Sequence, residues 1–175
     1  MKTDGIRTCQ SCGMPMSAKE QFGTEADGAL SKDYCTYCYR GGAFTAPGIT
    51  IDEMAKLGGE MMAQMYAIPP EKAIAFTKEH ISCLKRWAGR EIPLCESCGM
   101  PLARDEDAGT EAGGSLSTRY CIYCYRDGGF IEPDLTREGA IEQYAPMMAA
   151  NLGMPLEKAK EMVGYYLSTL PRWRE

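Results

Sequence analysis

Apolar residues recur at helical spacing along the middle of the chain. Residues 51–66 place them on one face of a helix, and Thr50 and Glu53 have the spacing of a capping box, so we expect this helix to begin after Thr50. Gly58-Gly59 interrupts the pattern with residues that disfavour a helix, so a kink or break is expected there. A last helix is expected over residues 69–87, where prolines can occupy the first helical turn.

The same pattern returns at a constant offset of 86 residues. Residues 9–89 align with residues 95–175 without a gap and share 35 identities in 81 positions. Pro146 directly follows the position of the glycine pair, so the same break is expected in the second copy. The chain is therefore two copies of one module, each near the lower size limit of a self-sufficient domain. The expected domains are residues 1–89 and 90–175, and the last helix of the second copy is expected over residues 155–173.

A shorter segment before the helices of each copy predicts a β-hairpin. Asp27-Gly28 in the first copy and Gly113-Gly114 in the second are dipeptides typical of two-residue type I′ loops. The expected strands lie near residues 22–26 and 29–34, and near residues 108–112 and 115–120. The fold class is therefore α+β, with two tandem repeats that each have a small hairpin followed by two or three short helices.

Eight of the nine cysteines form four Cys-x-x-Cys pairs that flank the two hairpins. The two residues inside a pair form a tight turn that aims both sulfurs at one ion, and two pairs complete a tetrahedron. A glycine follows the first pair of each copy and suits the positive φ of a metal knuckle. The predicted ligands are Cys9, Cys12, Cys35 and Cys38 in one centre, and Cys95, Cys98, Cys121 and Cys124 in the other.

The metal and the pairing of the ligands have alternatives. Zinc is the first expectation, with two ions per chain, but iron binds to the same four thiolates. Ligation across copies, which would combine Cys9 and Cys12 with Cys121 and Cys124, is less favoured because pairing within a copy closes a shorter loop.

The remaining chemically active side chains do not recur. His80 aligns with Tyr166, and the ninth cysteine, Cys83, aligns with Thr169. A catalytic zinc ion keeps an open coordination position, which four thiolates do not leave. We therefore find no recurring catalytic set and expect a protein that is not an enzyme.

Several side chains near the second knuckle and in the helices have two interpretations each. Tyrosines beside the second knuckle could stack nucleobases, but packing around the knuckle is favoured. Two arginines there could offset a negative metal centre, and two before tryptophans could dock the last helix. Helical methionines are interpreted as core, with an adaptable partner groove as the alternative. In the same order, these residues are Tyr37, Tyr39, Tyr123 and Tyr125; Arg40 and Arg126; Arg86 and Arg172; and Met61, Met62, Met65, Met147 and Met148.

Composition and charge limit the classes of partner. The chain has 45% hydrophobic and 25% charged residues, as ordinary globular proteins do. Its net charge of -5 is unfavourable for nucleic acid, and thiolate centres add negative charge. No apolar run reaches the roughly 20 residues of a membrane-spanning helix, and the N-terminal residues lack the apolar core of a secretory signal. A cytoplasmic, reducing location is expected.

Four motifs together resemble a known family, the putative zinc-ribbon domain family. They are Cys-x-Ser-Cys-Gly-Met-Pro, Gly-Thr-Glu-x-x-Gly-x-Leu-Ser, Tyr-Cys-x-Tyr-Cys-Tyr-Arg-x-Gly-x-Phe and a closing Leu-x-Arg-Trp, and all four occur twice. The resemblance covers almost the whole chain. It implies a four-cysteine zinc ribbon followed by helices, here duplicated where a single module is the expected form, and it implies no particular activity.

Three hypotheses for function follow. The first is a zinc-binding adaptor or regulatory protein that acts through protein contacts. The alternative is a thiol-redox or metal-responsive sensor, in which oxidation or metal loss opens the ribbon. A weaker alternative is a transcription-associated nucleic-acid binder, which the charge disfavours. The sequence leaves the oligomeric state open.

Overall fold

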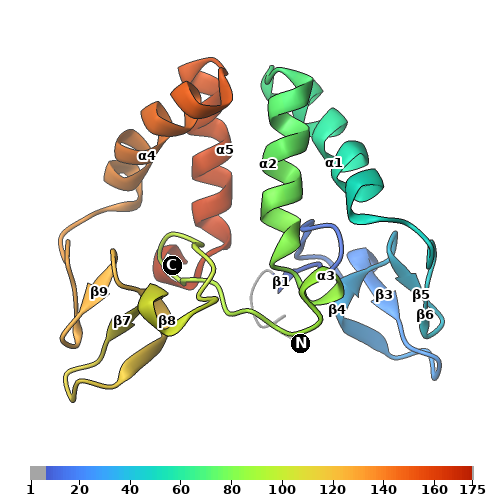
Figure 1. The fold of residues 1–175 in the computed structure, drawn as a ribbon, viewed down its shortest axis with the longest axis horizontal. Helices are drawn as coiled ribbons and strands as arrows, with labels where there is room; N and C mark the ends of the chain where they lie inside the picture. Colours follow the sequence, from blue (N-terminus) through green and yellow to red (C-terminus); the bar gives the residue numbers. More distant parts are fainter. Residues whose placement is uncertain (1–6, 175) are drawn as a thin grey trace. The chain divides into compact units, whose positions relative to one another are not determined.

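The computed structural model describes residues 7–174 (Figure 1). The chain divides into two compact units, Met1–Arg90 and Glu91–Glu175. Each unit has short antiparallel hairpins followed by helices, which confirms the predicted α+β class with two repeats (Figure 1).

The first unit begins with three small hairpins. Each pair of strands is antiparallel, and a 3-10 helix, η1, spans Lys19–Gln21. The pairs are β1 (Arg7–Thr8) with β2 (Pro15–Met16), β3 (Phe22–Thr24) with β4 (Leu30–Cys35), and β5 (Tyr39–Arg40) with β6 (Ala43–Phe44).

The loop between β3 and β4 is not the predicted two-residue type I′ turn. A type I′ turn needs positive φ at both central residues, whereas Gly28 has φ 84° and Asp27 is not in the positive-φ region. The Glu25 carbonyl accepts a hydrogen bond from Gly28 N–H, and Glu25 N–H donates to the Ala29 carbonyl. The loop is therefore a three-residue turn that ends in a left-handed glycine.

The next hairpin has the two-residue loop. Arg40 pairs with Ala43, and the two residues between them, Gly41 and Gly42, have φ values of 61° and 84°. Asp127 and Gly128 take the same place in the second unit, with φ values of 52° and 83°. An aspartate does adopt positive φ in this tighter turn, so the Asp-Gly signal at 127 and 128 marks the true two-residue hairpin.

The helices of the first unit are α1 (Ile51–Tyr66), α2 (Pro70–Ser82) and α3 (Lys85–Ala88). Helix α1 begins as predicted, because Thr50 Oγ1 accepts from Glu53 N–H and the Glu53 carboxylate accepts from Thr50 N–H. The predicted break at Gly58-Gly59 is wrong, since α1 is continuous. A Cβ atom at Gly59 would lie 2.6 Å from Ile74 Cα, so this glycine permits the close approach of α2.

The second unit repeats this order with small differences. A single bridge between Leu94 and Pro101 stands where the first unit has β1 and β2. Its elements are η2 (Asp105–Asp107), β7 (Ala108–Thr110), β8 (Leu116–Cys121), β9 (Tyr125–Arg126), β10 (Gly129–Phe130), α4 (Arg137–Leu152), α5 (Leu156–Thr169) and η3 (Pro171–Trp173). The loop from β7 to β8 also ends in a left-handed glycine, Gly114.

Helix α4 also runs through its expected break. Pro146 lies inside the helix and is exposed. Proline removes one helical N–H, but on an exposed side water can satisfy the carbonyl group that this N–H would have bound. The predicted break is therefore wrong in both copies, while the alternative of a kink stays a prediction.

The last helix, in contrast, is shorter than predicted in both copies. In the first unit the chain leaves α2 at Cys83, and Leu84 has an extended ψ of 149° before α3. In the second unit Leu170 is extended because Pro171 follows it, and proline disfavours a helical conformation in the preceding residue.

The helical methionines do not all belong to the core. The side chains of Met61, Met65 and Met147 are 66%, 56% and 60% exposed. The interpretation as core is therefore wrong for these three.

Among residues 7–174, none of the helices has both the length and the apolar character that crossing a membrane requires.

Candidate metal centres

The structure brings the eight paired cysteines together in two groups of four. Within each group the Sγ atoms all lie within 4.8 Å of one another. In each unit one pair lies in the turn near the start of the unit, and the other pair begins at the last residue of the six-residue strand of the hairpin. The groups are Cys9, Cys12, Cys35 and Cys38, and Cys95, Cys98, Cys121 and Cys124, so each forms within one copy.

A tight turn shapes the first knuckle of each unit. In the first unit Gly13 N–H donates to the Cys9 carbonyl at 3.0 Å, and Cys9 N–H donates to the Met14 carbonyl at 2.8 Å. Gly13 and its counterpart Gly99 both have φ 78°, which confirms the predicted role of the knuckle glycine. The backbone N–H of Cys35 donates to Cys9 Sγ at 3.3 Å and joins the two knuckles.

The second knuckle differs, as predicted from the tyrosine that follows it. Cys38 N–H donates to the Cys35 carbonyl at 3.0 Å, and Cys124 N–H donates to the Cys121 carbonyl at the same distance. The chain then enters β5 or β9 directly. The positive-φ residues come only after these strands, in the two-residue hairpin loop.

The spacing of the sulfur atoms fits a tetrahedral metal ion. Cys12 Sγ and Cys35 Sγ are 3.8 Å apart, and Cys98 Sγ and Cys121 Sγ are 3.6 Å apart. A tetrahedron with zinc–sulfur bonds of about 2.3 Å has edges of about 3.8 Å. Two ions per chain are therefore indicated, and since iron accepts the same ligands, the geometry does not select the metal.

Hydrogen bonds among the four thiols of each group shift their pKa values in opposite directions. A hydrogen bond with Cys12 is the largest cause that lowers the pKa of Cys9, and one with Cys35 is the largest that raises the pKa of Cys12. The pKa of Cys35 is lowered to about 7, chiefly by Cys12, and that of Cys121 to about 7, chiefly by Cys124. A metal ion would replace the remaining protons, so its binding weakens at low pH.

Arg86 and Trp87 bind the first knuckle of the first unit through hydrogen bonds to Ser11. Arg86 Nη1 donates to Ser11 Oγ at 3.0 Å, and Arg86 Nη2 donates to the Ala46 carbonyl at 2.7 Å. Trp87 Nε1 donates to the Ser11 carbonyl at 2.7 Å. The guanidinium also lies 4.0 Å from the centroid of the Phe44 ring, within cation–π range. These contacts dock the segment after α2 onto the knuckle, as predicted.

We call the arginine and tryptophan that bind the first knuckle the clamp: Arg86 and Trp87 in the first unit, Arg172 and Trp173 in the second. Arg172 Nη1 donates to Ser97 Oγ at 2.9 Å, and Arg172 Nη2 donates to the Glu132 carbonyl at 2.7 Å. Trp173 Nε1 donates to the Ser97 carbonyl at 2.7 Å. The segment after α5 is therefore docked onto the first knuckle of its unit in the same way.

The serine inside each first knuckle is a functional residue that our sequence reasoning missed. Ser11 and Ser97 are completely buried and accept from the clamp arginines. The signal was present, because the serine of Cys-x-Ser-Cys recurs in both copies. A polar residue retained between two ligands indicates a hydrogen-bonding role.

The arginines beside the second knuckle do not take the predicted place. Arg40 is exposed, and its Nη2 donates to Thr36 Oγ1 at 3.4 Å. Arg126 is exposed as well. A cation that contacts the first knuckle in both units is instead the clamp arginine, because the segment after the last long helix folds back onto that knuckle.

The tyrosines of the second knuckle divide into two pairs. Tyr39 packs against Tyr34 and Phe44, with ring centroids 5.1 and 5.4 Å apart, and Tyr125 has the equivalent contacts. The predicted packing is confirmed for this pair. It is wrong for Tyr37 and Tyr123, which are 75% and 76% exposed because the residue before the last cysteine points out of the turn.

His80 and Cys83 lie outside the four-sulfur groups. The His80 ring covers the first knuckle, with Cδ2 3.3 Å from the position of a Cβ atom on Gly13, and burial lowers the pKa of His80. Tyr166 covers Gly99 in the same way. The Cys83 thiol donates to the His80 carbonyl at 3.0 Å, and burial raises its pKa. All nine cysteines lie within the described residues, and none forms a disulfide.

Two cysteine knuckles joined by a β-hairpin and followed by helices define a zinc-ribbon type of protein. Residues 8–88 and 94–174 each match the family described as Putative zinc ribbon domain. The chain therefore belongs to this family, as a tandem duplication. Comparison with curated proteins and with solved structures gives no match.

Proposed function

We propose that the protein is a zinc-binding adaptor whose two metal centres are structural. The eight paired cysteines would hold two zinc ions, one in each unit. The observation that carries this proposal is the pair of closed four-sulfur groups, each held by a buried serine and an arginine. Such a group uses all four positions of a tetrahedral ion for protein ligands.

Zinc at these sites would contribute folding free energy and no substrate-binding position. Structural zinc ions supply apparent binding free energies of about 10–16 kcal/mol, which a small domain with a limited core needs. We therefore propose residues 1–89 and 90–175 as domains that each fold around their own ion.

Protein contacts are supported by the surface. Tyr37 and Tyr123 recur in both copies yet stay about three-quarters exposed, so packing within the module does not account for them. Exposed aromatic side chains are common at protein interfaces. The net charge of -5 favours a protein over a nucleic acid as partner. Because nine free cysteines persist best in a reducing compartment, we place the protein in the cytoplasm.

The test begins with metal analysis of full-length protein purified without oxygen. Two zinc ions per chain are expected, and iron or a single ion would overturn the assignment of the metal. The loaded protein then serves as bait in a lysate of its native cell, beside a bait from which a chelator has removed the metal. Partners specific to the loaded form support an adaptor. Turnover of a substrate by residues other than the cysteines would contradict it.

A thiol-redox sensor is the second candidate, favoured by one observation. Cys12 and Cys98 are partly exposed, whereas the other ligands of each group are buried. Hydrogen peroxide could take two electrons from two thiolates, which then join in a disulfide, while the peroxide takes up two protons and leaves as two water molecules. Release of zinc with loss of two thiols per centre supports this candidate, and full zinc retention under peroxide rejects it.

A further inference from the structure

Helix α1 exposes apolar side chains that the fold does not use. Leu57, Met61 and Met65, which we call the α1 stripe, are 59%, 66% and 56% exposed. Their spacing of four residues places them along one side of the helix. A different side of α1 supplies its buried residues, which are Ala55, Gly59 and Ala63.

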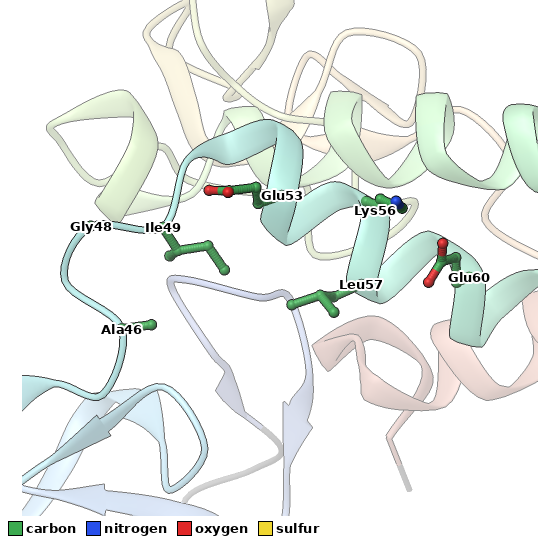
Figure 2. Close-up of a pocket in the computed structure, with 7 residues that line it drawn as sticks. All are labelled: Ala46, Gly48, Ile49, Glu53, Lys56, Leu57 and Glu60. Atoms are coloured by element: carbon green, nitrogen blue, oxygen red, sulfur yellow. The ribbon is translucent and has the colours of Figure 1, made fainter.

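A hollow adjoins one end of the α1 stripe. Figure 2 shows Ile49 and Leu57 pointing toward one another across it, beneath the start of α1. Its lining residues come from the segment before α1 and from the first turns of the helix: Ala46, Gly48, Ile49, Glu53, Lys56, Leu57 and Glu60. An apolar side chain of a partner would gain contacts on both sides in this hollow.

The second copy lacks most of this surface. Gln143 takes the place of Leu57, and Asn151 takes the place of Met65, while Met147 alone is retained. Both copies form the same long helix at this position. The fold therefore does not require apolar residues at 57 and 65, and their exposure serves a contact outside the module.

The charges around the α1 stripe select the kind of partner. Glu53 and Glu60 line the hollow together with one basic residue, Lys56, so the rim is acidic on balance. A second copy of this chain would bring the same acidic rim and the same net charge of -5 to the contact. A partner with basic residues beside its apolar face fits better.

We propose that the α1 stripe and its hollow dock an amphipathic helix of another protein, with Lys or Arg flanking its apolar face. The stripe spans about 12 Å from Leu57 to Met65 at 1.5 Å per residue, and the hollow extends it, which suits a helix of about three turns. Methionine side chains adapt to varied partner surfaces. This inference rests on the proposed adaptor function and specifies the chemistry of its partner.

The test uses the zinc-loaded full chain with ¹³C-labelled methionine methyl groups, observed by NMR. The probes are two synthetic amphipathic peptides of about 18 residues, with leucine along one face and either lysine or glutamate beside it. The lysine peptide is expected to shift the signals of Met61 and Met65, assigned by Met→Leu substitution, and to leave buried Met154 unchanged. The glutamate peptide should bind at least about tenfold more weakly.

A matched variant comes from the second copy. Leu57→Gln with Met65→Asn gives α1 the residues found in α4, so the variant should keep both zinc ions and its thermal stability. Affinity for the lysine peptide should fall about tenfold or more. The reverse variant, Gln143→Leu with Asn151→Met, should bring Met147 into contact with the peptide.

Several results would overturn the inference. They are equal peptide binding by the wild type and the Leu57→Gln, Met65→Asn variant, peptide binding without shifts at Met61 and Met65, and no binding at all. Shifts at Met61 and Met65 that depend only on protein concentration would replace it with self-association. If the variant captured the same native proteins as the wild type, the adaptor function would stand, but the α1 stripe and its hollow would not be the docking site. Capture by neither form would reject both.

Discussion

The two units have the same four-cysteine group and clamp, but the surfaces of their first long helices, α1 and α4, differ. Distances at the clamp are nearly equal, with Arg86 Nη1 3.0 Å from Ser11 Oγ and Arg172 Nη1 2.9 Å from Ser97 Oγ. The surface of α1 is apolar at Leu57, where α4 has Gln143. The centre and its clamp are therefore what the module requires, and the helix surface is where the copies were free to diverge.

The helix pairs also pack differently inside each unit. In the first unit α2 packs very close to Gly59. A Cβ atom added to this glycine would lie only 2.6 Å from Ile74 Cα. The second unit has Ala145 at the place of Gly59 and Lys160 at the place of Ile74. Lys160 instead forms an ion pair with Glu142 of α4 at 2.8 Å. A partly exposed ion pair of this kind contributes little to stability, so the first unit depends more on close helix contact.

The largest effect is expected from loss of one cysteine ligand. Cys38→Ser should abolish metal binding in the first unit alone, because the ligands of each centre come from one copy. That unit should unfold, since a structural zinc ion supplies about 10–16 kcal/mol of apparent binding free energy. Zinc content should fall from two ions to one, and Cys124→Ser should have the mirror effect on the second unit.

Metal analysis with two-dimensional NMR distinguishes the units in these variants. Folded signals of the second unit should survive Cys38→Ser. Cys83→Ser is the control, because Cys83 lies outside both groups and donates only to a backbone carbonyl. Loss of both ions in either ligand variant would show that the two units depend on each other for metal binding, which would contradict independent folding of each unit around its own ion.

The next effect concerns the clamp. Arg86→Met and Arg172→Met should each destabilise their unit by about 2–4 kcal/mol, because each removes charge-assisted hydrogen bonds to a buried serine and a backbone carbonyl, and a cation–π contact. The free energy of unfolding in urea, measured with zinc present, checks this. Arg40→Met, at an exposed position, should change it little. If the two clamp variants changed the free energy of unfolding by different amounts, the clamps of the two units would not be equivalent.

The sequence was sufficient to predict the two metal centres and the start of α1. Cysteine spacing gave the two four-sulfur groups and the Cys-x-x-Cys-Gly turns, and Thr50 gave the start of α1, because these features depend on local residues. The resemblance to the zinc-ribbon family is confirmed by the matches to both copies.

Three other features could not be predicted because they depend on tertiary contacts. A glycine pair indicates a helix break by propensity, but Gly59 is needed for the approach of α2. Helical spacing marked Met61 and Met65 as core, although only the fold decides which apolar face is covered. The clamp joins residues 75 positions apart, Ser11 and Arg86, and no local pattern shows that they meet.

A smaller effect tests the difference in helix packing. Gly59→Ala should destabilise the first unit by about 1–3 kcal/mol, because the new methyl group would overlap the backbone of α2 at Ile74. Helix propensity alone favours alanine by about 1 kcal/mol, so destabilisation identifies the close contact as the cause. Gly58→Ala is the matched control, since its Cβ atom would meet only the side chain of Thr77 at 3.1 Å. Urea unfolding of both variants gives the comparison, and stabilisation by Gly59→Ala would contradict close packing in this unit.

The smallest expected effect depends on pH and on the second unit alone. Burial raises the pKa of Tyr144 to about 12, and the first unit has Gly58 at this place. A tyrosine whose folded pKa is above its unfolded value of about 10 adds stability below pH 10, and this contribution is lost as the pH rises through the folded pKa. Because Tyr144 is only partly buried, the loss should not exceed about 1 kcal/mol. Tyr144→Phe should remove the late step of tyrosinate absorbance near pH 12 and flatten the fall in stability of the second unit between pH 10 and 12. An unchanged late step in this variant would assign the difference between the units to another tyrosine.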